Sequence, residues 1–302
     1  MPGSDKGSDT TVERMPAAEL VAVLAAVDGA NPVVLSVDSE PPSALRALPS
    51  GPMEPGHRSL QAGVRSWVER QTRHPLGHIE QLYTFADRGE GGPRAVSISY
   101  LALTRIGTTP LPGWRGWYAA FPWEDHRSAT GRAASEVLLD ALERWCGPVR
   151  ARRQRARALF GRDGVPWHPE WVLQRYELLF EAGLIAEAGH PAPLAETGTA
   201  MWHDHRRILA TGIARLRAKI QYHPVVFEML PDSFTLLHLQ QSVEAIAGRL
   251  VHKQNFRRLI AAQELVEETG QMSAGTGRPA RLYRFRGDVM RDRAVVGTKL
   301  PR

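Results

Sequence analysis

Residues 234–263 read FTLLHLQQSVEAIAGRLVHKQNFRRLIAAQ, and this stretch decides how the C-terminal part of the chain folds. Apolar residues recur in its first half at intervals of three and four, as Leu236, Leu239, Val243 and Ile246, which predicts an amphipathic helix. Thr235 precedes this helix as a good N-cap, and Gly248 is a typical terminator. A short turn then leads to a second helical segment. Two helices joined in this way are typical of a helix-turn-helix unit.

The second helix of this unit is predicted to bury Phe256, Leu259 and Ile260 and to expose polar and basic residues at its start. The predicted outward positions are Lys253, Asn255, Arg257 and Arg258. Further along, residues 275–279 (GTGRP) predict a hairpin tip with Arg278 at its apex, and the alternating residues 281–285 predict a strand that begins with Arg281. Helices followed by such a hairpin predict a winged helix, in which a tip arginine enters the minor groove or contacts phosphates.

The distribution of charge supports a nucleic-acid partner for this region. Residues 215–302 carry a net charge of +7 and residues 1–214 a net charge of −1, within the total of +6. A solvated basic face and an anionic lipid surface are the alternatives that charge alone leaves open. A single cysteine, Cys146, excludes an internal disulfide. No apolar run approaches the roughly 20 residues of a membrane span, so a cytoplasmic protein is expected.

At 302 residues the chain is expected to hold two domains. Strands are predicted at residues 33–37, 78–85, 95–103 and 114–121, and helices at 16–27, 60–73, 135–145, 149–160 and 169–182. Mixed strands followed by helices predict an α+β or α/β sandwich. The predicted division is a disordered tail at 1–15, an effector-sensing domain at 16–185, a linker and linker helix at 186–221, and a winged-helix DNA-binding domain at 222–302.

The quoted motifs resemble a known family. FEMLP (227–231), NFRR (255–258) and GRPARLY (277–283) closely resemble the winged helix of Nudix-related transcriptional regulators of NAD metabolism, the NrtR family. Upstream, HIEQLYTFADRG (78–89), SISYLALT (97–104) and FPWED (121–125) resemble the branch known as NadQ. The resemblance implies an N-terminal Nudix-like α/β/α sandwich. It also implies a repressor of NAD biosynthesis or salvage genes that binds double-stranded DNA. Because a lone small reader rarely gathers enough base contacts, a homodimer on a palindromic operator is expected.

Within this resemblance, the N-terminal domain is expected to sense a nucleotide such as NAD, ADP-ribose or ATP, with no other cofactor. Arg88, Tyr83, Trp123, Glu124 and Asp125 are the candidate effector-binding residues. Tyr83 and Trp123 are equally good candidates for core aromatics. One departure from the family concerns His252, which stands before the recognition helix where relatives have Asp, so the electrostatic benefit of an acid at that helix start is absent.

The N-terminal domain is predicted not to be an enzyme. A Nudix hydrolase carries G-x5-E-x7-R-E-U-x-E-E-x-G-U, whose glutamates hold Mg²⁺ against a pyrophosphate. The segment after residues 114–121 offers Glu136, Asp140 and Glu143 at helical spacing, but the Arg-Glu and Glu-Glu pairs are missing. No metal site is predicted, because the ligand-type residues of 202–205 (WHDH) are adjacent and point apart on a helix. The alternatives are a Nudix-type hydrolase with an appended nucleic-acid module, and a winged helix that binds RNA or protein.

Overall fold

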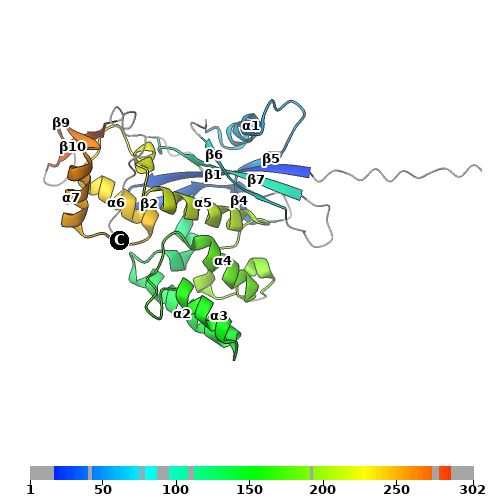
Figure 1. The fold of residues 1–302 in the computed structure, drawn as a ribbon. Helices are drawn as coiled ribbons and strands as arrows, with labels where there is room; N and C mark the ends of the chain where they lie inside the picture. The colour runs from blue at the N-terminus through cyan, green and yellow to red at the C-terminus, as the bar shows by residue number, and fades with distance from the viewer. Residues whose placement is uncertain are drawn as a thin grey trace, which may run out of the picture.

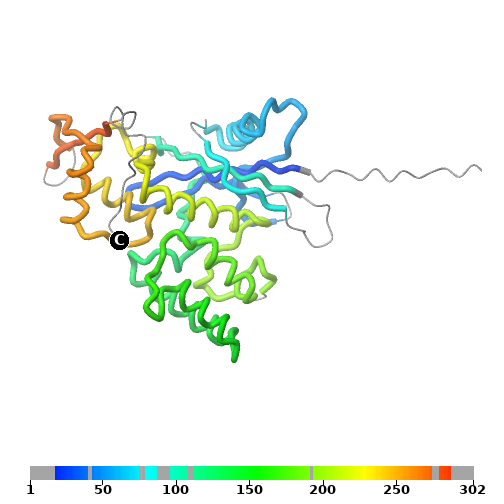
Figure 2. Tube along the Cα trace, in the orientation of Figure 1, coloured from blue at the N-terminus to red at the C-terminus, as the bar shows by residue number. Residues whose placement is uncertain are grey.

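The computed structural model describes residues 17–39, 43–74, 76, 79–86, 95–107, 112–190, 193–273 and 279–286. Its centre is a mixed sheet with the strand order β6-β7-β1-β2-β8, in which β5 also pairs with β1. These strands are β1 (Ala17–Asp28), β2 (Asn31–Leu35), β5 (Ser50–Pro52), β6 (Ile79–Phe85), β7 (Ala95–Leu103) and β8 (Trp114–Gly116). β1 and β7 run parallel and the other pairs antiparallel. Figure 2 shows blue β1 beside cyan β7, although the two are distant in sequence.

The first strand corrects one prediction, because residues 16–27 were expected to form a helix and 17–28 form β1. β1 lies between β7 and β2, so both of its edges are paired, and cores on the two sides of the sheet bury both of its faces. Leu20, Ala22 and Leu24 face one core, and Val21, Val23 and Ala25 face the other. Such a strand is apolar nearly throughout, and periodicity alone does not separate it from a buried helix.

Helices cover both faces of the sheet, which gives the predicted α/β/α sandwich (Figure 1). On one face lies α1 (Leu60–Thr72), the helix predicted at 60–73, with Ser59 as its N-cap. On the other lies α5 (His205–Lys219), with α4 (Val172–Glu181) packed on α5, and beyond them lie α2 (Ala129–Cys146) and α3 (Arg150–Leu159), which pack on each other. The strand predicted at 114–121 is shorter than expected. It ends at Gly116 and continues as two 3₁₀ turns, η1 (Trp117–Ala119) and η2 (Pro122–Glu124).

The helix predicted as a linker is a packed element of the first domain. Ile208, Ile213 and Leu216 of α5 are fully or almost fully buried in the same core as Val21 and Val23 of β1. The preceding segment contains two more 3₁₀ turns, η3 (Ala186–Ala188) and η4 (Ala195–Thr197). Because α5 contributes this apolar surface to the sheet, it fixes the start of the C-terminal domain to the first domain instead of spacing the two apart.

The C-terminal part has the predicted winged-helix order. It comprises η5 (Val225–Met229), α6 (Leu236–Ala247), α7 (Lys253–Gln263), β9 (Val266–Met272) and β10 (Arg281–Phe285). The Thr235 side chain accepts a hydrogen bond from the His238 amide, as expected of the N-cap, and Gly248 ends α6 in the left-handed conformation. No helix of the described ranges combines the length and apolar character that a bilayer span requires. The predicted tail at 1–15 lies outside the described residues.

Candidate nucleic-acid interface and its junction with the first domain

The recognition helix α7 presents a polar and basic face to solvent. Phe256 and Ile260 are buried beneath it. The four predicted DNA-contacting residues, Lys253, Asn255, Arg257 and Arg258, are all exposed. The N-cap residue His252 makes no side-chain capping hydrogen bond, and the first turn of α7 contains no acid. The start of this helix therefore carries uncompensated positive charge, as a surface that meets phosphates requires.

The turn before α7 is held by a residue that the sequence did not single out. Glu244 of α6 is almost fully buried, and its Oε1 accepts hydrogen bonds from the Val251 amide at 3.0 Å and from Gln240 Nε2 at 2.9 Å. A buried carboxylate thus fixes the backbone that enters the recognition helix.

The hairpin that follows α7 carries cations paired with acids. Arg281 Nη1 lies 2.7 Å from Glu268 Oε1, and Arg284 Nε lies 2.6 Å from Glu267 Oε1. Both pairs are exposed, so the arginines can exchange these partners for phosphates at little cost. Arg278, predicted at the hairpin tip, lies outside the described residues.

The structure separates the predicted effector-binding residues. Tyr83 is 60% exposed on β6, an outer strand of the sheet, whereas Trp123 and Glu124 are fully buried in η2, beyond the opposite edge strand β8. Trp123 packs edge-on against Phe121 in the core. The prediction that Trp123 and Glu124 contact an effector is therefore corrected, because neither side chain reaches the surface. Arg88 lies outside the described residues.

Asp125 is occupied as well. Its two carboxylate oxygens accept hydrogen bonds from Nε and Nη2 of Arg127, at 2.7 and 3.1 Å. A bidentate pair of this kind is among the stronger side-chain interactions. An effector that binds Asp125 would first have to displace Arg127, so Asp125 is a structural acceptor in this arrangement.

Glu124 is the centre of a buried charge cluster. Its Oε1 lies 2.5 Å from Arg175 Nε, and its Oε2 lies 2.9 Å from Arg175 Nη2 and 2.5 Å from Arg217 Nη1. All three side chains are fully buried. Burial alone would raise the pKa of Glu124, but the two guanidinium groups outweigh burial and hold the pKa below its ordinary value. We call Glu124, Arg175 and Arg217 the buried cluster.

His126 lies beside the buried cluster, and its lowered pKa predicts that the stability of the protein depends on pH. Its ring stacks on that of Trp167, with ring centres 4.1 Å apart. Burial lowers the pKa of His126 from 6.5 to about 4. Glu124 opposes this shift, and the positive charges of Arg175 and Arg217 add to it. A folded-state pKa below the unfolded value gives stability that is present above pH 6.5 and is lost as the pH falls toward 4. Acidification from pH 7 to 5 should therefore remove about 2 kcal/mol through this residue.

Urea denaturation of the wild type and of His126→Gln at both pH values measures this contribution. The variant should be less stable at pH 7 but should lose about 2 kcal/mol less than the wild type on acidification. Equal losses in the two proteins would show that His126 is not the group responsible.

The Nudix signature falls on a different segment from the one predicted. When G-x5-E-x7-R-E-U-x-E-E-x-G-U is laid over β5 and α1 from Gly51, Arg65 and Glu69 occupy their expected positions. The other three glutamate positions hold His57, Ser66 and Arg70. The segment in which the signature was sought belongs instead to α2, where Glu136 and Glu143 form ion pairs with Arg162 and Arg157. The prediction missed the segment because only a few signature positions are kept.

In this segment the Glu54 carboxylate, which could bind a cation, is already in contact with Arg70 and His57. The Glu54 carboxylate lies 3.1 Å from Arg70 Nη2 and 3.2 Å from His57 Nε2. Arg70 also covers the ring of Trp67, which fills the space beside Gly51. A guanidinium where a glutamate is required repels Mg²⁺. Within the described ranges, no group of three or more His, Cys, Asp or Glu side chains is placed to hold a metal.

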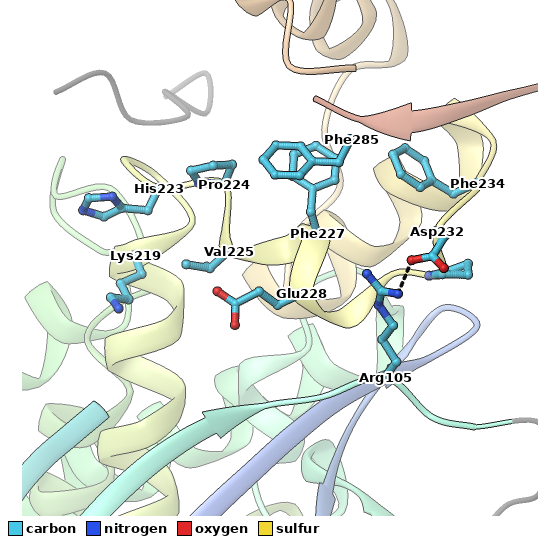
Figure 3. Close-up of a pocket in the computed structure, with 11 residues that line it drawn as sticks. Arg105, Lys219, His223, Pro224, Val225, Phe227, Glu228, Asp232, Phe234 and Phe285 are labelled. Atoms are coloured by element: carbon cyan, nitrogen blue, oxygen red, sulfur yellow. Dashed lines mark hydrogen bonds and ion pairs between the residues drawn. The ribbon is translucent and has the colours of Figure 1, made fainter. Parts of the chain in front are cut away.

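A cavity of about 490 Å³ lies where the two domains meet (Figure 3). Arg105 and Lys219 border it from the first domain, and Phe227 and Phe285 of the winged helix stack over it with ring centres 4.3 Å apart. Both cationic side chains that line it form ion pairs, Arg105 with Asp232 and Lys219 with Glu80. The cavity thus lies between the two domains, with an aromatic wall from the winged helix and both cations in contact with carboxylates.

Comparison with known proteins identifies the relatives of this chain. Residues 226–285 match the family model of the NrtR DNA-binding winged helix domain. A protein of Acinetobacter baylyi named ADPR responsive transcriptional repressor NtrR is 40% identical over 82 residues, which are 27% of this chain and 33% of the relative. The chain therefore matches about one third of the length of this curated relative.

Solved structures extend the likeness to the fold of the whole chain. Shewanella oneidensis NrtR, crystallised with a 27mer DNA, superposes with a TM-score of 0.54 at 20% identity, covering 90% of this chain and 94% of that one. A MutT/nudix family protein from Enterococcus faecalis gives a TM-score of 0.52 at 17% identity, covering 95% and 89%. These comparisons confirm the predicted resemblance, and they confirm the fold: a Nudix-like α/β domain followed by a winged helix.

Proposed function

We propose that this chain is a DNA-binding transcriptional repressor of the NrtR type, controlled by a nucleotide that binds its Nudix-like domain. The observation that carries the proposal is helix α7, which exposes five polar or basic side chains (Lys253, Gln254, Asn255, Arg257 and Arg258) on a segment that matches the NrtR DNA-binding winged helix. The relative's name adds repression and a response to ADPR. The target genes we propose are those of NAD biosynthesis or salvage.

In this proposal α7 enters the major groove. Arginine suits guanine and asparagine suits adenine, so Arg257, Arg258 and Asn255 are the candidates for reading bases, while Lys253 neutralises phosphate. The hairpin would contribute Arg281, together with Arg278, which the sequence predicts at its tip. A single winged helix gathers few base contacts, and a homodimer on a palindromic operator doubles them.

We further propose that the Nudix-like domain binds its effector without hydrolysing it. The signature segment keeps Glu69 but holds His57, Ser66 and Arg70 where a hydrolase has metal-binding glutamates. Arg65 and Arg70 would then meet the charge of a pyrophosphate that Mg²⁺ neutralises in an enzyme, with Arg70 exchanging its exposed contact with Glu54 for a phosphate. Tyr83 and Arg88 remain candidates for further contacts. The alternative function, a Nudix-type hydrolase, requires magnesium-dependent release of AMP from ADP-ribose by the purified protein.

A mobility-shift titration tests the function. The full chain is titrated against duplex DNA from the promoters that neighbour its own gene, alone and with ADP-ribose, NAD or ATP, and against RNA of the same sequence. We expect a discrete complex with one duplex, and a change of at least about fivefold in its dissociation constant with one nucleotide. Equal affinity for RNA, or for unrelated duplex, would contradict the proposal.

A further inference from the structure

The first domain completes the helix-turn-helix unit by binding the end of its first helix. Tyr118 Oη donates a hydrogen bond to the Ala245 carbonyl at 2.6 Å, and Arg217 Nε donates one to the Ile246 carbonyl at 2.8 Å. Both carbonyls belong to the last turn of α6, where carbonyl groups have no partner within the helix. Two residues of the first domain therefore cap α6.

The turn that follows α6 is packed against the same residues. Gly248 has a φ of +70°, and a Cβ atom added to it would lie 2.3 Å from the Glu124 carbonyl oxygen, 2.5 Å from Arg217 Nη2 and 3.1 Å from Tyr118 Oη. Only a glycine permits this approach. The backbone of the turn thus lies directly on the first domain, and α7 begins five residues later, at Lys253.

The buried cluster fixes the groups that hold this turn. Arg217 Nη1 is bound by the Glu124 carboxylate, and Arg217 Nη2 donates to the Glu124 carbonyl at 3.1 Å and to Tyr118 Oη at 3.2 Å. Glu124 is bound in turn by Arg175 of α4. A displacement of α4, α5 or η2 would therefore change how the turn is held.

We propose that Tyr118, Glu124 and Arg217 act as positioning residues that fix the orientation of the recognition helix relative to the Nudix-like domain. Through them, binding of the effector would change that orientation and so the affinity for DNA. The proposal rests on the proposed function. A ligand changes DNA affinity only where its binding energy differs between two arrangements of the protein. The contact between these residues and the turn at 245–248 joins the first domain directly to the helix-turn-helix backbone, whereas the ion pair of Arg105 with Asp232 holds a residue that lies before α6. A change in how the turn is held would therefore alter the position of α7.

Tyr118→Phe in the full chain tests this proposal, because the substitution removes one hydroxyl and keeps the ring. Hydrogen–deuterium exchange is measured on the free protein, and the operator dissociation constant is measured with and without ADP-ribose. We expect exchange of the amides at 245–252 to accelerate about fivefold, as for the loss of one hydrogen bond, while those of α2 remain as in the wild type. The ratio of the two dissociation constants should move toward one by about threefold or more.

Gly248→Ala provides a second variant, with Gly183→Ala as its matched control. Gly183 has a similar φ of +66°, but an added Cβ would meet nothing within 4 Å. Both variants carry the backbone strain, and only Gly248→Ala displaces the turn, so only it should reduce the nucleotide effect.

The outcomes are distinguishable. Failure of the wild type to bind duplex DNA overturns the proposed function. Unchanged exchange at 245–252 in Tyr118→Phe overturns the positioning role. Accelerated exchange with an unchanged ratio of dissociation constants overturns the transmission of the effector signal through this contact.

Discussion

Replacing Glu124 by glutamine is expected to lower the free energy of unfolding by about 3–5 kcal/mol, because it leaves two buried guanidinium groups without their counter-charge. Glutamine keeps the size and shape of the side chain, so the loss would report on charge and not on packing. Arg175 retains hydrogen bonds to the Leu159 and His168 carbonyls, and Arg217 retains its bond to the Ile246 carbonyl. Urea denaturation at pH 7 measures the change.

Glu181→Gln is the matched control for this substitution. Glu181 Oε2 lies 2.5 Å from Arg155 Nη1, the same distance as in the buried cluster, but both side chains are more than 40% exposed. Water and ions screen such a pair, so its loss should change stability by less than about 1 kcal/mol. Similar losses in the two variants would contradict the view that burial gives the cluster its importance.

The second large effect is expected on DNA binding. Replacing Arg257 and Arg258 together by alanine should weaken operator binding by about 30-fold or more, since a base or phosphate contact contributes about 1–3 kcal/mol. The dependence of affinity on salt concentration should also become shallower, by about one unit of slope for each phosphate that is no longer neutralised. Both side chains are exposed on α7, so folding should be preserved. Fluorescence anisotropy at several salt concentrations measures both quantities.

Arg144→Ala with Arg150→Ala removes the same charge elsewhere. These exposed residues lie in the last turn of α2 and at the start of α3, far from α7 in Figure 1. We expect this control to bind the operator within about twofold of the wild type, because exposed charges beyond a Debye length are largely screened. An equal loss in both double variants would assign the effect to net charge and not to the recognition helix.

Local patterns predicted much of the secondary structure. Spacing of three and four residues and the cap at Thr235 predicted α6, and helical spacing also predicted α1, whose N-cap Ser59 the structure added. The strand at 95–103 was also predicted within the observed bounds. The helix expected at 16–27 was wrong, because a central strand with both faces buried lacks the alternation that marks a half-buried one.

The candidate site shows a similar division. The outward residues of α7 follow from the helical period, since a position on a helix surface is fixed by its neighbours in sequence. By contrast, Trp123 and Glu124 were predicted to meet an effector and are fully buried. Nothing near residue 124 indicates that its partners are Arg175 and Arg217, which come from two later helices.

The sequence by itself therefore determined the winged helix and the face of α7 that is exposed to solvent. These properties depend on residues within one or two helical turns, or on residue type alone. Only the tertiary structure decided that Glu124 joins two distant arginines and that Tyr118 and Arg217 hold the end of α6. Such contacts form when separate elements pack together. The spacing of their residues in the sequence is set by the fold and not by a helix or strand repeat, so no periodic pattern in the sequence reveals them.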